Sequence, residues 1–193
     1  MPNWTLPAGS IKPLIAFHGT DASILTNPGV TPIHGQAPTP GYTGRTVVSG
    51  FRVNLALCRS NTDFGQGFYV TTSLHQARQW ANARWLRTGG TGGNALVVGF
   101  ALDRDWLAAL ESVAFPRPIQ DFWDLVTDCR HGFRPHQRLP PHNPPFDVIY
   151  GPVTIWPQKL VIQDCDQISF HTTRAVRNLA DPWIEDQGAP TFP

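Results

Sequence analysis

The stretch 63–72, Asp-Phe-Gly-Gln-Gly-Phe-Tyr-Val-Thr-Thr, constrains the fold more than any other part of the chain. Gly65 and Gly67 predict a turn, because glycine adopts backbone conformations that other residues avoid. The apolar residues after them predict a short strand around Tyr69. A Thr-Thr-Ser cluster then caps a helix, and apolar residues at helical spacing predict that this helix covers 74–86. The chain must therefore pass through a turn, a strand and a helix here.

The other apolar segments predict further short strands and helices. The continuous apolar run 95–102 predicts a strand that is buried on both faces. The first apolar run is expected to break into a turn at His18-Gly19, and the segment from Asp21 to Ser23 is expected to cap a helical turn. The remaining expected strands cover 14–17, 51–57, 146–153 (stopped by Gly-Pro), 160–162 and 167–170, and the remaining expected helices cover 105–112, 119–130 and 173–179.

The composition favours one domain made of short elements. The chain has 193 residues and a hydrophobic fraction of 41%, which suffices for a core, while 19 Pro and 17 Gly favour many turns. We therefore predict a single α+β domain over 1–193, with its core at about 14–180. Irregular loops are expected at 27–50, where we predict a flexible flap, and at 131–145. The tail 181–193 is expected to be loosely packed.

Several functional classes lack their signatures in this sequence. A formal net charge of +1 gives no overall electrostatic attraction for nucleic acid, and three widely spaced Cys fit neither a disulfide framework nor a zinc site. We find no phosphate-binding glycine loop, no nucleophile elbow and no His-Glu-x-x-His, so we expect no metal. The sequence also shows no signal-peptide pattern and no apolar run near ~20 residues. We expect a cytoplasmic protein with no membrane partner, and delivery as a secreted effector is the alternative.

Three segments carry residues suited to a flat ligand that is rich in hydroxyl groups. His18 can hydrogen-bond a hydroxyl, and Gly19 lets a flat amide approach the backbone, although a structural His is the simpler interpretation. Trp80 follows Tyr69 by eleven positions, so a strand and a helix can hold a planar ring between two aromatic side chains. Taken alone, such a pair is more often explained by core packing. Gln167 shares one strand face with Ser169, where exposure to solvent is the alternative.

In combination these segments resemble the ADP-ribosyltransferase superfamily. The motifs are Phe-His-Gly-Thr at 17–20, the stretch 63–72, Phe-Asp-Val-Ile-Tyr-Gly-Pro-Val at 146–153, and Asp-Gln-Ile-Ser-Phe-His-Thr at 166–172. The chain looks most like the His-Tyr-Glu branch, which contains diphtheria toxin and the poly-ADP-ribose polymerases. Within that branch it is similar to a microbial family of largely uncharacterised function. The resemblance covers about residues 14–180.

The resemblance implies a fold and a set of binding residues. The implied fold is a split antiparallel β-core, in which two small sheets surround an NAD cleft and short helices flank them. His18 would contact the adenosine ribose, and the Gly19 backbone would bond the nicotinamide carboxamide. Tyr69 would stack on the nicotinamide, and Trp80 stands where the branch has its second stacking Tyr. Thr20, Gly67 and Ser169 would complete the site.

Two positions depart from the pattern of the branch. Ala77 replaces a Ser that bonds the carboxamide in the polymerases, and Thr71 and Thr72 are candidates to take its place. Gln167 stands at the position of the superfamily Glu, whose carboxylate holds the 2′-hydroxyl of the nicotinamide ribose and favours an oxocarbenium-like transition state. A Gln amide accepts a hydrogen bond but brings no negative charge. The loss costs on the order of 3 kcal/mol, or about a hundredfold in rate.

The Gln does not by itself imply an inactive protein. The similar microbial family carries Gln at this position as a rule. An acidic group can come from the substrate, or from Asp147, Asp164 or Asp166. Because activation of a ribose hydroxyl depends most on the Glu, we expect a single transfer and no chain elongation.

We therefore predict an NAD-dependent mono-ADP-ribosyltransferase with a toxin or effector role. NAD is the substrate, Gln167, His18 and Tyr69 are the expected catalytic residues, and the protein is expected to be a monomer. The acceptor is a protein or nucleic acid, with a small molecule still open. The Arg- and His-rich loop 130–142 is either a contact for an anionic substrate or a solvated polar loop. The alternatives are an NAD glycohydrolase and a non-catalytic module that binds NAD, ADP-ribose or a partner.

Overall fold

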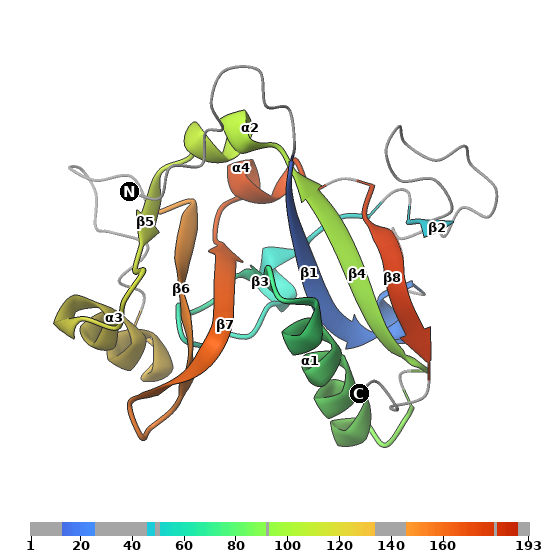
Figure 1. The fold of residues 1–193 in the computed structure, drawn as a ribbon, viewed down its shortest axis with the longest axis horizontal. Coiled ribbons are helices and arrows are strands. Elements are labelled where there is room, and N and C mark those ends of the chain that lie inside the picture. The colour runs from blue at the N-terminus through green and yellow to red at the C-terminus, as the bar shows by residue number, and fades with distance from the viewer. Residues whose placement is uncertain are drawn as a thin grey trace. The chain divides into compact units, whose positions relative to one another are not determined.

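The computed structural model of the chain describes residues 13–25, 46–48, 51–91, 93–133, 146–179 and 181–188. They form two small sheets and a few short helices, so the fold is α+β as predicted (Figure 1). Contacts divide the chain into two compact units, and the chain passes from one unit to the other at 14/15, 52/53, 69/70, 102/103 and 178/179. Each unit contains one sheet. The single domain predicted over 1–193 stays a prediction.

The first sheet has the strand order β1-β4-β8-β2. Its strands are β1 (Leu14–Asp21), β4 (Ala95–Leu102), β8 (Trp183–Gly188) and β2 (Thr46–Val47). Strand β8 pairs antiparallel with both β4 and β2. All of β4 except Ala101 is buried, as its apolar run predicted. The short 3-10 helix η1 (Ala22–Leu25) follows β1, and Asp21 accepts a hydrogen bond from the backbone N–H of Ser23 at 3.1 Å, which confirms its capping role.

The helix α1 (Leu74–Arg87) covers this sheet, as its sequence pattern predicted (Figure 1). The side chain of Ser73 caps its first turn by accepting from the backbone N–H of Gln76, and the glycines after it adopt positive φ. Its small residues Ala77 and Ala81 are fully buried against β4. Because these side chains are small, the helix backbone can lie close to the sheet.

Two predictions for the first unit are wrong. Strand β1 does not break at His18-Gly19 but continues to Asp21, because Gly19 lies directly under the backbone of α1. The tail is not loosely packed over its whole length, because β8 lies within it. Trp183 of β8 is buried, and its ring occupies the space where a Cβ on Gly99 would lie, 2.3 Å from Trp183 Cε2.

The second sheet has the strand order β3-β7-β6-β5. Its strands are β3 (Phe68–Val70), β7 (Leu160–Phe170), β6 (Val148–Ile155) and β5 (Ser112–Ala114). Strands β6 and β7 are antiparallel, but β5 and β6 are parallel. The expectation of a wholly antiparallel core is therefore wrong at this pair. The connection 115–147 is long enough to return the chain to the same end of the sheet, as a parallel pair requires.

The helices of the second unit are α2 (Arg104–Ala108), α3 (Gln120–Arg130) and α4 (Thr173–Val176). Helix α3 matches its prediction and buries Phe122, Val126 and Cys129. Helix α2 is shorter than predicted, because Ser112 already belongs to β5. Helix α4 is also shorter than its predicted range.

The strand predictions for the second unit need three corrections. The strand 146–153 does not stop at Gly-Pro, since Pro152 lies beside a bulge and beyond Tyr150, the last residue of β6 that pairs with β5. The two strands predicted at 160–162 and 167–170 form one strand, β7. The strand predicted at 51–57 is absent from these described residues. The 3-10 helix η2 (Leu55–Leu57) replaces it, because the Asn54 side chain accepts from Ala56 N at 3.1 Å.

Most of the two predicted irregular loops lies outside the described residues. The flap at 27–50 is described only at 46–48, where β2 forms, and the loop 131–145 only at 131–133. The anionic-substrate loop 130–142 is described only at its first four residues, 130–133.

Two buried carboxylates link the stability of the fold to pH. Burial raises the pKa of Asp21 and of Asp147, but hydrogen bonds outweigh it and hold both pKa values below the usual 3.8. The donors are Ser23 and Arg84 for Asp21, and Arg174, Thr172 and the backbone of Glu111 for Asp147.

The fold is therefore expected to weaken in acid below about pH 4. A carboxylate with a lowered folded-state pKa contributes stability that is complete above its unfolded pKa and is lost as the pH falls through the folded pKa. In an Asp147→Asn variant, the free energy of unfolding should depend less steeply on pH in this window. Urea unfolding at a series of pH values measures both slopes, and equal slopes would contradict the assignment.

Candidate functional site

Gln167 is the residue at which the sequence departs most from the resembling superfamily, and it is buried in the second sheet. It lies on β7 with 2% of its surface exposed, so it does not face solvent. Its Nε2 donates one hydrogen bond to Asp63 Oδ2 at 2.6 Å and another to the carbonyl oxygen of Pro152 at 2.9 Å. The side chain is thus fixed by the turn before β3 and by the neighbouring strand β6.

These two partners determine which way the Gln167 amide faces. An ionised carboxylate and a backbone carbonyl can only accept hydrogen bonds, so the NH₂ group must face them. The amide oxygen then faces the other way. Within the described part of the chain, no group donates a hydrogen bond to this oxygen. The Gln167 amide oxygen is therefore a hydrogen-bond acceptor whose orientation is fixed.

Asp63 connects four segments of the second unit. Its buried carboxylate accepts hydrogen bonds from the Thr154 hydroxyl at 2.6 Å and the Thr154 backbone N–H at 3.0 Å, besides the bond from Gln167. The Arg130 guanidinium at the end of α3 donates to the same carboxylate through Nε at 2.9 Å and through Nη2. This buried anion is thus fully paired, as a charge in this environment must be.

Tyr69 is held tightly in the same unit. Its hydroxyl lies 2.7 Å from Thr62 Oγ1, 2.8 Å from the Gly65 carbonyl and 3.0 Å from the Phe64 N–H. Its ring stacks on Phe64 at a centroid distance of 6.4 Å, and 8% of the residue is exposed. Burial raises the pKa of Tyr69 far above its usual value, so the hydroxyl stays protonated at neutral pH. Gly65, with φ 77°, is the turn glycine that the sequence predicted.

Gly67 lies where Ser169 and His171 approach the backbone. A Cβ at Gly67 would lie 2.6 Å from Ser169 Oγ and 2.8 Å from His171 Cε1. His171 lies 2.9 Å from the Gln66 carbonyl through Nδ1 and 2.9 Å from Ser169 Oγ through Nε2. Nδ1 must donate, because a carbonyl only accepts. Ser169 also hydrogen-bonds Tyr69 and is fully buried.

The other predicted residues belong to the first unit. A Cβ at Gly19 would lie 2.0 Å from the Ala77 carbonyl oxygen and 2.8 Å from Ala81 N. The packing of α1 therefore already explains the glycine. Thr20 is buried, whereas His18 is partly exposed.

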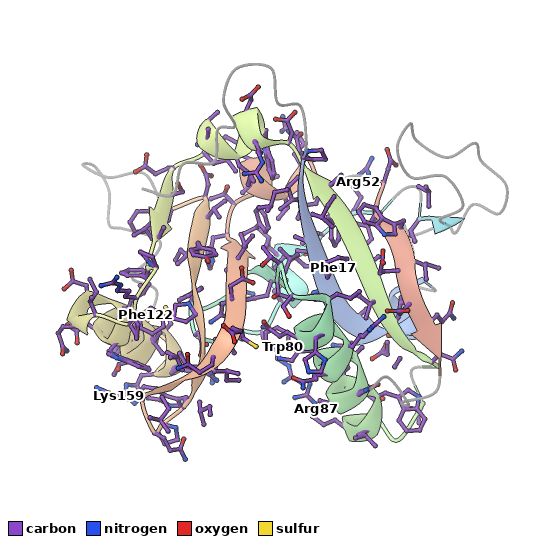
Figure 2. All side chains as sticks on the ribbon, viewed as in Figure 1. Phe17, Arg52, Trp80, Arg87, Phe122 and Lys159 are labelled. Carbon is purple, nitrogen blue, oxygen red and sulfur yellow. The ribbon has the colours of Figure 1, made fainter. Side chains whose placement is uncertain are left out.

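Thr71 and Thr72 precede the first turn of α1, and Trp80 lies within the helix. Thr71 is buried, its hydroxyl donates to Gln76 Oε1 at 2.9 Å, and it accepts from the Ser73 N–H at 3.0 Å. Thr72 is exposed. Trp80 is half-buried on α1, where Figure 2 labels it, and no hydrogen bond or ring contact joins it to the described residues.

The structure thus gathers the predicted residues into two groups. Within the second unit it brings together Gly67, Tyr69, Gln167 and Ser169, and within the first unit it holds His18, Gly19, Thr20, Thr71, Thr72 and Trp80. Their roles in binding NAD stay predictions.

Sequence reasoning did not identify the partners of Gln167. Asp63 heads the motif at 63–72, but its contacts with Thr154 and Gln167 join residues 91 and 104 positions apart, which no local pattern indicates. Of the carboxylates proposed to replace the superfamily Glu, Asp147 is instead engaged by Thr172, Arg174 and the Glu111 backbone.

The described residues were also searched for metal-binding groups of side chains and for membrane-spanning helices. No group of three or more His, Cys, Asp or Glu side chains in these ranges is arranged to hold a metal ion. Among the helices of the same ranges, none is both long enough and apolar enough to cross a membrane.

Comparison with known proteins identifies a family for this chain. A search of curated proteins and a search of solved structures found no match to the chain. The family described as "Protein of unknown function (DUF3990)" matches residues 43–155, which is more than half of the chain. This match includes Asp63, Tyr69, Trp80 and Thr154, whereas His18 and Gln167 lie outside it. The chain therefore belongs to the DUF3990 family.

Proposed function

We propose that the protein is an NAD-dependent mono-ADP-ribosyltransferase that moves one ADP-ribose from NAD to a macromolecular acceptor. The four motifs quoted above support the superfamily, and an α+β fold with two small sheets agrees with it. The observation that carries the proposal is the fixed Gln167 amide. Its NH₂ group is held by Asp63 and Pro152, and its oxygen is left to accept a hydrogen bond.

In the proposed reaction, Gln167 acts on the nicotinamide ribose. Its amide oxygen accepts a hydrogen bond from the ribose 2′-hydroxyl and steers a transition state that resembles an oxocarbenium ion. The bond between C1″ and the nicotinamide nitrogen breaks, and nicotinamide leaves with the electron pair. The acceptor nucleophile then bonds C1″ and loses its proton. A neutral amide stabilises the positive charge less than a carboxylate does, so the expected turnover is slow.

The other predicted residues would bind NAD without changing covalently. His18 would bond the adenosine ribose, the Gly19 backbone would bond the carboxamide, and the Trp80 indole would stack on a ring. The Tyr69 hydroxyl already bonds Thr62, Phe64 and Gly65, so Tyr69 can offer a ligand only its ring.

Incubation of the purified protein with NAD tests the proposal. Nicotinamide release together with labelled macromolecules from a cell lysate supports transfer. Free ADP-ribose without labelled macromolecules supports the glycohydrolase instead, which uses water as the acceptor. No nicotinamide release, with or without lysate, would contradict both enzymatic functions. NAD binding under those conditions would then support the non-catalytic module.

Replacement of Trp80 tests the binding role separately. Trp80→Ala is expected to weaken NAD binding about tenfold, because stacking of a base on an aromatic ring contributes roughly 1–3 kcal/mol. Trp80→Phe, which keeps an aromatic ring, should recover most of the affinity. The thermal stability of both variants should stay near that of the parent, since Trp80 makes no ring contact or hydrogen bond to the described residues. Titration calorimetry measures the affinities, and equal NAD affinity in Trp80→Ala would contradict the role.

A further inference from the structure

We infer that Asp63 is the positioning residue of the reaction, which acts by fixing the orientation of the Gln167 amide. This inference rests on the proposed function and adds a residue to it. Asp63 touches no proposed substrate atom. Its effect would pass through the 2.6 Å hydrogen bond from Gln167 Nε2 to Asp63 Oδ2.

The orientation matters because the two ends of an amide differ: the oxygen accepts hydrogen bonds and the NH₂ group donates them. If the Gln167 amide rotated by half a turn, its oxygen would lie against Asp63 Oδ2 and the Pro152 carbonyl oxygen. All three of these oxygens are hydrogen-bond acceptors, so no hydrogen bond could form there. The NH₂ group would then take the place of the acceptor. A donor at that place suits a ribose hydroxyl less well than an acceptor, because the hydroxyl could no longer donate its proton to the protein. Asp63 and Pro152 together exclude this orientation.

Asp63 can do this because it is itself immobile. Thr154 on β6 donates to it twice, and Arg130 at the end of α3 pairs with it. One carboxylate therefore fixes the position of Gln167 on β7 relative to β6 and α3. Precise placement of this kind is what a reacting group requires from the residues behind it.

Asp63 does not replace the charge of the missing Glu. The guanidinium of Arg130 lies directly against it, so the pair is close to neutral as seen from Gln167. Its contribution is orientation, together with polarisation of the amide by a hydrogen bond to a charged group, which makes the amide oxygen a better acceptor. The expected effect is therefore on turnover rather than on the binding of NAD.

Asp63→Asn tests the inference. Asn offers one acceptor oxygen where Asp offers two, and Arg130, Thr154 and Gln167 all donate to this position. If the oxygen stays with Arg130, the new NH₂ group faces Gln167 and releases or turns its amide. We expect kcat for nicotinamide release to fall about tenfold, while the Kd for NAD changes less than about threefold.

Thr154→Val is the matched control. It removes the hydroxyl that donates to Asp63 but leaves the bond between Asp63 and Gln167. It should lower thermal stability while retaining most of kcat in the folded protein, because the Thr154 N–H and Arg130 still hold Asp63 in place. The inference is overturned if Asp63→Asn keeps the kcat of the parent, or if its loss of kcat at equal folded fraction only matches that of Thr154→Val.

A measurement on the unmodified protein covers the case in which Asp63→Asn fails to fold. NMR of the side-chain amides should show the Gln167 NH₂ protected from hydrogen exchange, and still protected when an unreactive NAD analogue binds. A freely exchanging or reoriented amide overturns the inference, even if the protein turns over NAD. If the unmodified protein neither binds NAD nor releases nicotinamide, the proposed function itself fails, and the amide still reports whether Asp63 fixes it.

Discussion

Gln167→Glu is expected to lower the free energy of unfolding by about 3 kcal/mol at pH 7, although it restores the residue of the resembling superfamily. The Nε2 position of Gln167 lies 2.6 Å from Asp63 Oδ2 and 2.9 Å from the Pro152 carbonyl oxygen. A carboxylate oxygen there would face two acceptors in a buried environment, and one of them is charged. Urea unfolding of the variant and the parent measures the difference.

Gln163→Glu is the control for this substitution. Gln163 lies on the same strand, β7, but it is exposed, so the same chemical change should alter stability by less than about 0.5 kcal/mol. Nicotinamide release by Gln167→Glu should also fall, because the new side chain must move away from Asp63. Unchanged stability together with faster turnover would contradict the stabilising and orienting role of the hydrogen bond between Asp63 and Gln167.

Gly19→Ala is expected to cost about 3 kcal/mol or more of stability. The added Cβ would lie 2.0 Å from the Ala77 carbonyl oxygen and 2.8 Å from Ala81 N. Both are backbone atoms of α1, so no side-chain rotation relieves the overlap. The helix would have to move away from β1, which would open the contact between Ala77, Ala81 and β4.

The matched control is Gly188→Ala on β8 of the same sheet. A Cβ at Gly188 meets nothing within 4 Å, so this variant should unfold close to the parent. Thermal or urea unfolding compares the two variants directly. A Gly19→Ala protein as stable as Gly188→Ala would contradict the close packing of α1 on β1.

Elements that local patterns specify were predicted correctly. The cap and the apolar spacing of α1, the apolar run of β4 and the pattern of α3 each lie within about fifteen residues. Such signals are decided by neighbours in sequence, through capping and periodicity. The turn at Gly65 was predictable for the same reason, because positive φ favours glycine.

Elements that distant contacts specify were predicted poorly. β1 runs past His18-Gly19 because α1, more than fifty residues later, covers it. β8 forms because Trp183 fills the space above Gly99. At 51–57 a local signal was missed, since the weak alternation suggested a strand while the Asn54 side chain favours a turn.

The candidate site shows the same division. The sequence indicated Gln167 through its motif, but not what holds it. Asp63, Arg130 and Thr154 meet only after β6, β7 and α3 are in place. Their pairing depends on burial and on the three-dimensional arrangement of these elements, which cannot be predicted from the spacing of residues in the sequence.

A crystal structure of the protein with an unreactive NAD analogue tests whether the Gln167 amide oxygen holds the nicotinamide ribose. We expect the 2′-hydroxyl of the nicotinamide ribose to lie about 3 Å from Gln167 Oε1, while Nε2 still bonds Asp63 and the Pro152 carbonyl. An analogue that binds without touching Gln167, or a Gln167 amide that turns its NH₂ group toward the ligand, would contradict it.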